Sequence, residues 1–405
     1  MIRVFVARIE DPSYPRNHRI RAYLERHGYH VEAHLRSRAG GARGFVADVR
    51  AIARGARSND VVLVSEMSLP YVPFAWFAAR ARRRLLVVDG FVRKYETAVV
   101  DRGLYPRWSF RALRDRAVDA LSIRLSDIYL TDTEVRAEEL SAAYPRRRVV
   151  SLPVGAPAWA VPAPHRPQDG VLRVLFYGSF LALHGTDTIV RAIARMETRT
   201  ARLTLVGTAD HEGGPATLAA LARDLGISDR IVMHPDVPAE ELARIIADHD
   251  VVLGLFGASH KASGVIANKV WQGLACGRTV VTRESPALAE ISGIVGASQL
   301  RTVPPADPGA LAAVLDELAR RPRVDVPRLH IALEEYTASR FDGLNALIAR
   351  ELWRVAGDRR DGRRVIRDVK GSRGAACAAR SPHSDGRQTD ISSAGGTTGC
   401  GETRT

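Results

Sequence analysis

The sequence predicts an α/β protein with two doubly wound domains. Its 405 residues exceed what one ordinary hydrophobic core organises. Apolar runs of strand length alternate with amphipathic stretches of helix length in both halves, which is typical of parallel sheets covered by helices. Segment 156–170 contains four prolines, interrupts the alternation and is predicted to be a linker.

The first domain is expected over residues 1–155. Several of its strand-like runs are almost wholly apolar, which indicates a parallel sheet buried on both faces. The expected strands are 2–9, 30–35, 61–66, 84–90, 127–133 and 148–155. Helices are expected between them, for example at 17–28, which Gly28 ends, and at 109–126.

The second domain is expected over residues 171–335, where the alternation restarts. The expected strands are 171–179, 201–208, 230–235, 250–256 and 278–282. A long helix follows at 329–356. From 357 to 405 the chain has almost no large hydrophobic residues. We expect this tail to be disordered, because it cannot bury enough apolar surface to offset the entropy of ordering.

The chain carries a net charge of +14, with 59 basic and 45 acidic residues. Nearly all the basic residues are arginines scattered over different elements, and no helix-turn-helix, zinc-finger or RNA-recognition signature is present. Specific nucleic-acid binding is therefore not expected. The same charge suits anionic substrates or peripheral contact with an anionic membrane.

The N-terminal segment lacks the apolar stretch and cleavage site of a signal peptide, and no run reaches the roughly 18 apolar residues of a membrane span. We expect a cytoplasmic protein, located at the inner face of the membrane if its basic surface contacts lipid. The three cysteines have neither disulfide nor zinc-ligand spacing. Cys276 is therefore expected to be a small buried residue, and no metal site is expected.

The loop after strand 171–179 predicts an anion site. Gly178 ends the strand, and Gly185 precedes the next helix, whose first backbone N–H groups point towards a bound anion. Ser179 and His184 lie on the rim of this loop and can donate hydrogen bonds to phosphate oxygens. The alternative is a plain strand–helix turn with a surface histidine.

A second candidate loop follows strand 250–256. Lys261, Ser263 and the backbone around Gly264 supply hydrogen-bond donors at the carboxyl end of that strand. Ligands of open α/β sheets bind at this edge. The loop is therefore expected to face the same ligand as the loop at Gly178.

The helix after this second loop places a lysine near its N-terminus. Asn268 and Gln272 are spaced i, i+4 and share one face, and Lys269 is adjacent to Asn268. A cation near a helix N-terminus is unfavourable unless an anion lies nearby, so we expect Lys269 to meet a phosphate. The alternative is a solvated lysine on an ordinary helix.

The segments "YGSFLALHG" (177–185) and "NKVWQGLACGRTVVT" (268–282) resemble the donor-binding motifs of retaining, nucleotide-sugar-dependent glycosyltransferases of the family 4-like group. The resemblance spans about residues 1 to 350 and is strongest over 171–290. It implies the GT-B fold, in which two Rossmann-like domains face each other across a cleft. It also implies that a C-terminal helix, 336–356, returns to the N-terminal domain.

The resemblance assigns roles to residues of the second domain. Lys269 is the remaining cation for the diphosphate, because Ser179 and His184 stand where the family has a basic pair. Gln272 replaces the glutamate that binds the ribose. Gly264 replaces a second glutamate, so backbone donors around 262–265 would have to contact the donor sugar.

The N-terminal domain would then bind the acceptor. Charged residues crowd the segment 87–106 after its fourth strand, although the usual family histidine is absent. Asp89 is the first candidate for orienting the acceptor or taking its proton, and Glu96 is the second. A structural salt-bridge cluster is the equal alternative.

We therefore expect a hexosyltransferase that moves a sugar from a nucleotide-diphosphate donor to an acceptor hydroxyl with retention. The acceptor could be a saccharide, a lipid-linked sugar or a small metabolite. No cofactor is expected beyond the nucleotide sugar as co-substrate. Two alternatives stay open: a nucleotide-sugar epimerase of the same fold, and a non-catalytic nucleotide-sugar-binding protein.

Overall fold

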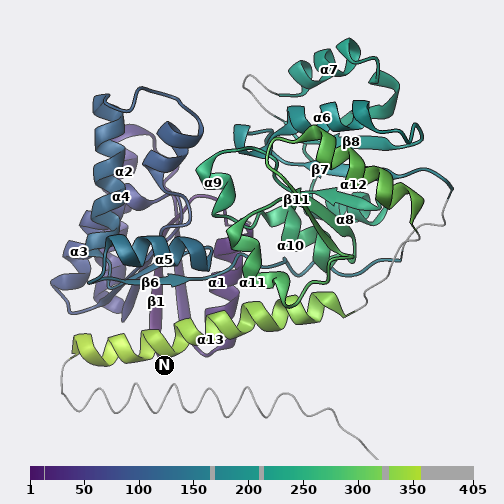
Figure 1. The fold of residues 1–405 in the computed structure, drawn as a ribbon. Helices are drawn as coiled ribbons and strands as arrows, with labels where there is room; N and C mark the ends of the chain where they lie inside the picture. Colours follow the sequence, from purple (N-terminus) through teal and green to yellow (C-terminus); the bar gives the residue numbers. More distant parts are fainter. Residues whose placement is uncertain (13, 165–168, 209–213, 322–327, 357–405) are drawn as a thin grey trace, which may run out of the picture.

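A computed structural model describes residues 1–12, 14–164, 169–208, 214–321 and 328–356. The predicted disordered tail, 357–405, and residues 165–168 of the predicted linker lie outside the described residues. The described part consists of two parallel sheets of six strands each, flanked by helices (Figure 1). No helix among these residues is long and apolar enough to cross a bilayer.

The first sheet has the strand order β2-β1-β3-β4-β5-β6, and all its strand pairs are parallel. Its strands are β1 (Arg3–Ile9), β2 (His30–Leu35), β3 (Val61–Val64), β4 (Leu85–Asp89), β5 (Ile128–Thr131) and β6 (Arg148–Ser151). Its helices are α1 (Pro15–Arg26), α2 (Gly41–Ser58), η1 (Leu69–Tyr71), α3 (Val72–Arg80), the π-helical turn η2 (Glu96–Asp101), α4 (Phe110–Leu125) and α5 (Glu134–Ala143). Both faces of β3 and β4 are buried, which accounts for their continuous apolar sequence.

The second sheet has the order β12-β11-β10-β7-β8-β9, again with parallel pairs only. Its strands are β7 (Arg173–Tyr177), β8 (Arg202–Val206), β9 (Ile231–His234), β10 (Val251–Leu253), β11 (Thr279–Arg283) and β12 (Leu300–Val303). Its helical elements are η3 (Ala182–His184), α6 (Thr186–Arg195), α7 (Pro215–Asp224), η4 (Ser228–Arg230), α8 (Ala239–Ala247), α9 (His260–Ser263), α10 (Asn268–Ala275), η5 (Pro286–Leu288), α11 (Ala289–Ser292) and α12 (Pro308–Arg320).

These two sheets confirm the predicted fold class. The expected strands all form, within a few residues of their predicted limits. The sequence prediction omitted β12, an edge strand with the short, mixed sequence Leu-Arg-Thr-Val. Only Val303 of this strand is buried, so its sequence lacks the apolar run that identifies the inner strands.

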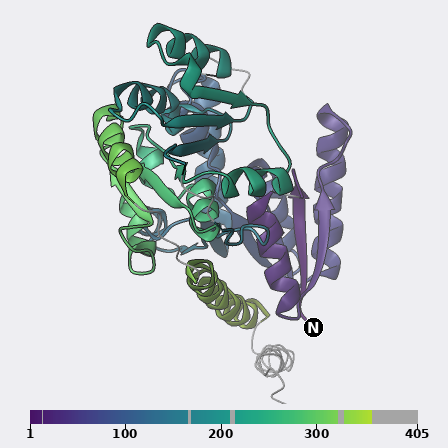
Figure 2. The same ribbon diagram turned by 90° about the vertical axis from the view of Figure 1, so that its right-hand side faces the viewer.

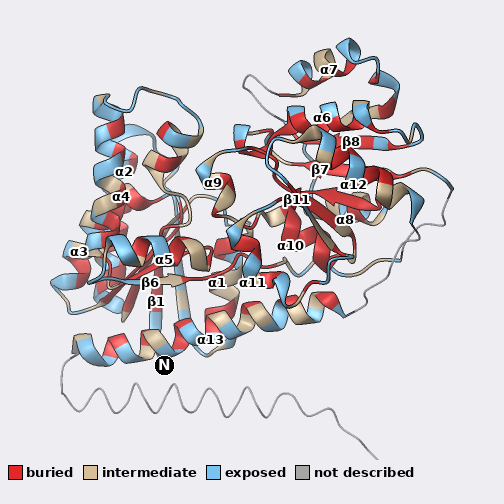
Figure 3. Ribbon diagram, viewed as in Figure 1, coloured by how far each residue is buried: buried red, intermediate tan, exposed pale blue. Residues whose placement is uncertain are grey.

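Helix α13 (Leu329–Ala356) joins the two halves of the molecule. Its first turns, with Leu329 and Leu333, pack into the core around Trp271 of α10. Its later turns, with Phe341 and Ile348, belong to the core under the first sheet. Figure 1 shows α13 running along the base of both halves, Figure 2 shows it from another side, and Figure 3 shows buried residues along its inner face.

Candidate functional site

Three predicted site residues meet where β7 ends. Gly178 has φ +136°, and its N–H donates to the carbonyl oxygen of Val206 at 2.9 Å. A Cβ atom at Gly178 would lie 3.4 Å from His184 Cε1 and 3.5 Å from Lys269 Nζ. Glycine therefore leaves the space in front of the histidine and the lysine open.

Lys269 is a buried cation. Its side chain is 6% exposed, and burial lowers the pKa of its ammonium to about 7. Nζ lies 4.6 Å from the centre of the Phe176 ring, a cation–π contact. No carboxylate among the described residues forms an ion pair with it, and burial is the one cause of its pKa shift. Such a charge is costly to bury without an anion, so the position suits an anionic ligand.

His184 is held by its own loop. Its Nδ1 accepts a hydrogen bond from the Leu181 N–H at 3.2 Å, and its ring packs edge-on against Phe176 at 5.4 Å. Its carbonyl oxygen accepts from the Phe256 N–H at 3.0 Å, which ties the loop to the chain after β10. The ring is 9% exposed and lies beside Gly178 with Lys269.

Gly185 sets the start of α6. It has φ +60°, and a Cβ there would lie 2.7 Å from both Gly257 N and Phe256 C. Only glycine fits this left-handed turn against a neighbouring backbone. Ser179, by contrast, is exposed at the mouth of the loop. The loop therefore brings a helix N-terminus and two polar side chains to one place.

Asn268 and Gln272 lie on α10 beside this group. Gln272 is 6% exposed, and its Oε1 accepts from the Tyr177 hydroxyl at 2.7 Å. The side chain of Asn268 instead hydrogen bonds with Tyr14, which comes from the first half. The start of α10 is therefore also a contact between the two halves.

The loop at α9 faces the first half. Lys261 Nζ donates to Thr97 Oγ1 at 2.9 Å, Ser263 Oγ donates to the carbonyl oxygen of His260 at 2.7 Å, and the Gly264 carbonyl oxygen accepts from Thr133 Oγ1 at 2.6 Å. Ala262 of α9 belongs to the same buried apolar cluster as Leu183 of η3, so this loop adjoins the loop that carries His184. The sequence predicts one shared ligand for the two loops, and this stays a prediction; the hydrogen bonds of Lys261 and Gly264 run to η2 and to the start of α5.

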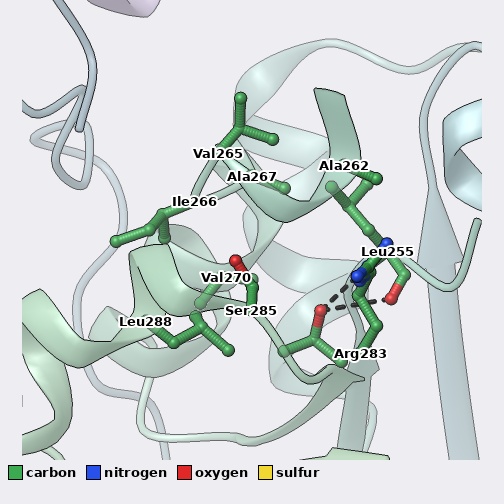
Figure 4. Close-up of a pocket in the computed structure, with 10 residues that line it drawn as sticks. Leu255, Ala262, Val265, Ile266, Ala267, Val270, Arg283, Ser285 and Leu288 are labelled. Carbon is green, nitrogen blue, oxygen red and sulfur yellow. Dashed lines mark hydrogen bonds between the residues drawn. The ribbon is translucent and has the colours of Figure 1, made fainter. Parts of the chain in front are cut away.

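A small pocket lies next to this second loop (Figure 4). Its wall is mostly apolar, with residues such as Leu255, Ile266 and Leu288. Neither His184 nor Lys269 lines it, so it is separate from the buried cation.

Asp89 forms an internal ion pair. It is 0% exposed, and the Nε of Arg16, itself 1% exposed, lies 2.8 Å from its Oδ2. Arg16 also donates to the carbonyl oxygens of Leu152 and Thr131 at 2.5 and 3.1 Å. This is the structural salt bridge that the sequence left open as the alternative, and through it Arg16 ties α1 to the ends of β4 and β5.

Glu96 opens the π-helical turn η2 and is also paired. Its carboxylate contacts the guanidinium groups of Arg93, at 2.9 Å, and Arg136. Burial alone would raise the pKa of Glu96, but the two arginines outweigh it and lower the pKa overall. A carboxylate with two cationic partners is a poor proton acceptor.

Sequence reasoning missed Glu66, which lies two residues after the end of β3. Glu66 is 2% exposed, and Asn17 Nδ2 donates to its Oε1 at 2.8 Å, while its buried Oε2 has no hydrogen-bond partner in the described part of the chain. Burial and the charge of Asp89 raise its pKa to about 7. Tyr14, whose pKa is raised to about 12 by burial and by Glu66, reaches Asn268 across the halves. The signal in the sequence was a carboxylate at the carboxyl end of the expected apolar strand 61–66.

Sequence comparison connects the half of the chain that contains Lys269 to a known family. Residues 172–321 match the family Glycosyl transferases group 1. The chain is 29% identical over 206 residues to a D-inositol 3-phosphate glycosyltransferase of Acidothermus cellulolyticus, covering 44% of this chain and 45% of the relative. The corresponding protein of Frankia alni is 32% identical over 169 residues, covering 38% of each chain. The match thus spans less than half the length of these curated relatives.

Solved structures match the arrangement of both halves. Anabaena HepE in complex with UDP covers 93% of this chain and 100% of its own, with a TM-score of 0.55 and 14% identity. A sucrose-phosphate synthase of Thermosynechococcus elongatus has the same coverage, a TM-score of 0.60 and 15% identity. The fold is that of the GT-B glycosyltransferases.

Proposed function

We propose that this protein transfers a sugar from a nucleotide-diphosphate sugar to an acceptor hydroxyl, with retention of the anomeric configuration. The observation that carries the proposal is the buried ammonium of Lys269, which lacks an ion-paired carboxylate among the described residues and lies beside Gly178 and His184. The family match over residues 172–321 supports it independently.

A diphosphate suits this position for an electrostatic reason. Its negative charge would offset the cost of burying the Lys269 ammonium, and the open side of Gly178 would admit a phosphate oxygen. His184, Ser179 and the N-terminus of α6 would supply further donors. These groups would stabilise the leaving diphosphate without requiring a metal.

In the proposed reaction, the bond between the anomeric carbon and the diphosphate oxygen breaks, and the acceptor oxygen bonds to the same carbon. The acceptor proton leaves with the diphosphate. The acceptor would approach from the first half, where Tyr14 contacts Asn268 beside Lys269. Asp89 and Glu96 would stabilise the part of the first half that the acceptor approaches, since both are paired with arginines.

The decisive experiment measures thermal unfolding of the full chain with UDP, GDP, dTDP, ADP and CMP, each with and without an attached sugar. UDP is the first choice because the solved HepE structures contain it. A ligand at about 100 times its Kd should stabilise the fold by roughly 2.7 kcal/mol. Lys269→Ala should abolish this shift, and Lys94→Ala, which removes a lysine of the first half, should keep it.

Product analysis then separates the activities. Sugar transfer that requires an acceptor supports the proposal, whereas an epimerised donor without an acceptor indicates an epimerase. Stabilisation without any product indicates a binding protein. If no nucleotide stabilises the chain, or if Lys269→Ala retains full affinity, the assignment of the diphosphate site fails.

A further inference from the structure

The segment before and at the start of α4 exposes large nonpolar side chains. Trp108 and Phe110 are each 82% exposed, Leu104 is 62% exposed and Leu113 is 47% exposed. No other large hydrophobic residue in the described part of the chain is as exposed as Trp108 and Phe110. A cluster of this kind is unusual on a free surface and marks an interaction site.

Arginines alternate with these nonpolar residues. The exposed arginines of the segment are Arg102, Arg107, Arg111, Arg114 and Arg116. Over 102–116, all of which the structure describes, Asp115 is the one acidic residue, and it is buried against Tyr105 and Arg114. The segment therefore presents positive charge that no exposed acid offsets.

The fold holds this segment outward. Ser109 caps α4 by accepting a hydrogen bond from the Ala112 N–H at 3.2 Å, and the buried face of the helix carries Ala112, Asp115 and Ile123. Phe110, Arg111, Leu113 and Arg114 consequently remain on the exposed side. These side chains are free to contact a partner, because α4 packs against the rest of the protein through its opposite face.

The segment adjoins the contact between the two halves. Asp101, which ends η2, lies 3.3 Å from Ser259 Oγ and 3.9 Å from Lys261 Nζ. The exposed arginines and hydrophobic residues begin directly after it. Whatever binds the segment is thus held beside the junction of the two halves.

We propose that this basic–aromatic surface (Arg102, Leu104, Arg107, Trp108, Phe110, Arg111, Leu113 and Arg114) binds the face of an anionic lipid bilayer. The arginines pair with lipid phosphates, and the nonpolar side chains enter the boundary between headgroups and acyl chains. Tryptophan and arginine both suit this boundary, because each combines a polar end with apolar surface. Lipid binding does not depend on the proposed sugar transfer.

The charge argues against the other occupants. A second copy docking through the same surface would place arginines against arginines, which is unfavourable. Nucleic acid would pair with the arginines and stack on the aromatic rings, but it offers no apolar layer for Leu104 and Leu113. A bilayer satisfies both kinds of side chain.

The test is co-sedimentation of the full chain with vesicles of phosphatidylcholine alone or mixed with phosphatidylglycerol. The wild type should sediment only with the anionic vesicles, and added salt should weaken the binding. Trp108→Ser/Phe110→Ser and Arg107→Glu/Arg111→Glu should each lower the partition coefficient about tenfold or more. The matched control Arg191→Glu/Arg195→Glu reverses two exposed arginines of α6 and should change it less than about twofold.

Tryptophan fluorescence tests the same lipid contact without the double variants. Tryptophan emission should shift to shorter wavelength when anionic vesicles are added, and Trp108→Phe should lose that shift. The proposal is overturned if the wild type ignores anionic vesicles, or if the α6 control loses binding as strongly as the surface variants. It is also overturned if the chain dimerises without lipid and Trp108→Ser/Phe110→Ser abolishes the dimer.

Discussion

At the scale of single residues, the chemistry of the candidate site depends on which charges have partners. Asp89 and Glu66 both lie at the carboxyl ends of apolar strands of the first sheet, but Asp89 pairs with Arg16, whereas the Oε2 of Glu66 has no hydrogen-bond partner among the described residues. Lys269 is the corresponding buried cation of the second half, and it has no ion-paired carboxylate among the described residues. A bound ligand changes the electrostatic energy of a buried ionisable group most when that group has no charged partner in the free protein.

Lys269 predicts how nucleotide affinity depends on pH. Its pKa in the free protein is about 7, and a bound diphosphate must raise it, so binding above pH 7 takes up a proton. Diphosphate affinity should fall as pH rises above 7, by up to about tenfold per pH unit, until the pKa of the complex is passed. Isothermal titration calorimetry from pH 7 to 9, in buffers of different ionisation enthalpy, measures both effects.

The control for this dependence is Lys269→Arg. A guanidinium keeps its proton throughout this range, so the affinity of the variant should be almost independent of pH. An equally steep decline in Lys269→Arg would assign the dependence to another group.

At the scale of elements, the site depends on close contact between the loop before α6 and the chain after β10. Gly185 lies against the backbone of Phe256 and Gly257, and the carbonyl oxygen of His184 accepts from the Phe256 N–H. The sequence predicted this loop from its glycines and the expected strand end. The sequence could not show that the backbone after β10 lies against this loop, because segment 250–256 is distant from the loop along the chain. The pairing of β10 with β7 in the sheet brings the two together.

Gly185→Ala should therefore lower the free energy of unfolding by more than the strain of placing alanine at a positive φ. The new Cβ would lie 2.7 Å from two backbone atoms, so the loop must move and both stability and diphosphate affinity should fall. Gly226→Ala is the matched control, since Gly226 has φ +67° and no atom of the described residues lies within 4 Å of the added Cβ.

We expect the control to lose about 1 kcal/mol and Gly185→Ala to lose roughly 2 kcal/mol more. Thermal unfolding and nucleotide titration of both variants measure this difference. Equal losses would show that the close contact contributes nothing.

At the scale of the whole molecule, α13 couples the halves by placing its two ends in different cores. Leu333 packs near Trp271 of α10, and Phe341 packs below the first sheet. The buried carboxylate of Glu351 pairs with Arg148 at 2.6 Å and fixes the end of the helix to β6. A change in this helix therefore affects the position of one half relative to the other.

Phe341→Ala should lower the free energy of unfolding by about 3 to 5 kcal/mol, because it leaves a cavity at a side chain that is 2% exposed. Ile331→Ala, at a position of the same helix that is 47% exposed, should change it by less than about 0.5 kcal/mol. Urea unfolding followed by two probes, tryptophan fluorescence and circular dichroism, measures both. Similar small changes in the two variants would contradict the role of α13 in the first core.

The sequence by itself determined the two parallel sheets and nearly all of their strands. Strand–helix alternation and apolar runs are local properties of the sequence. Together they are enough to predict a parallel strand that is buried on both faces. The same reasoning identified Gly178, His184 and Lys269 singly, from a strand end and a helix start. It omitted β12, whose mixed edge sequence carries little of that local signal.

Only the tertiary structure decided which polar residues are partners. Arg16 and Asp89 are 73 positions apart, and Thr133 and Gly264 are 131 positions apart, yet each pair is in contact. Helix α10 likewise brings Lys269 to Gly178, and Asn268 to Tyr14. Ion pairs and hydrogen bonds depend on distance in space, and sequence periodicity reports only the face of an element on which a residue lies.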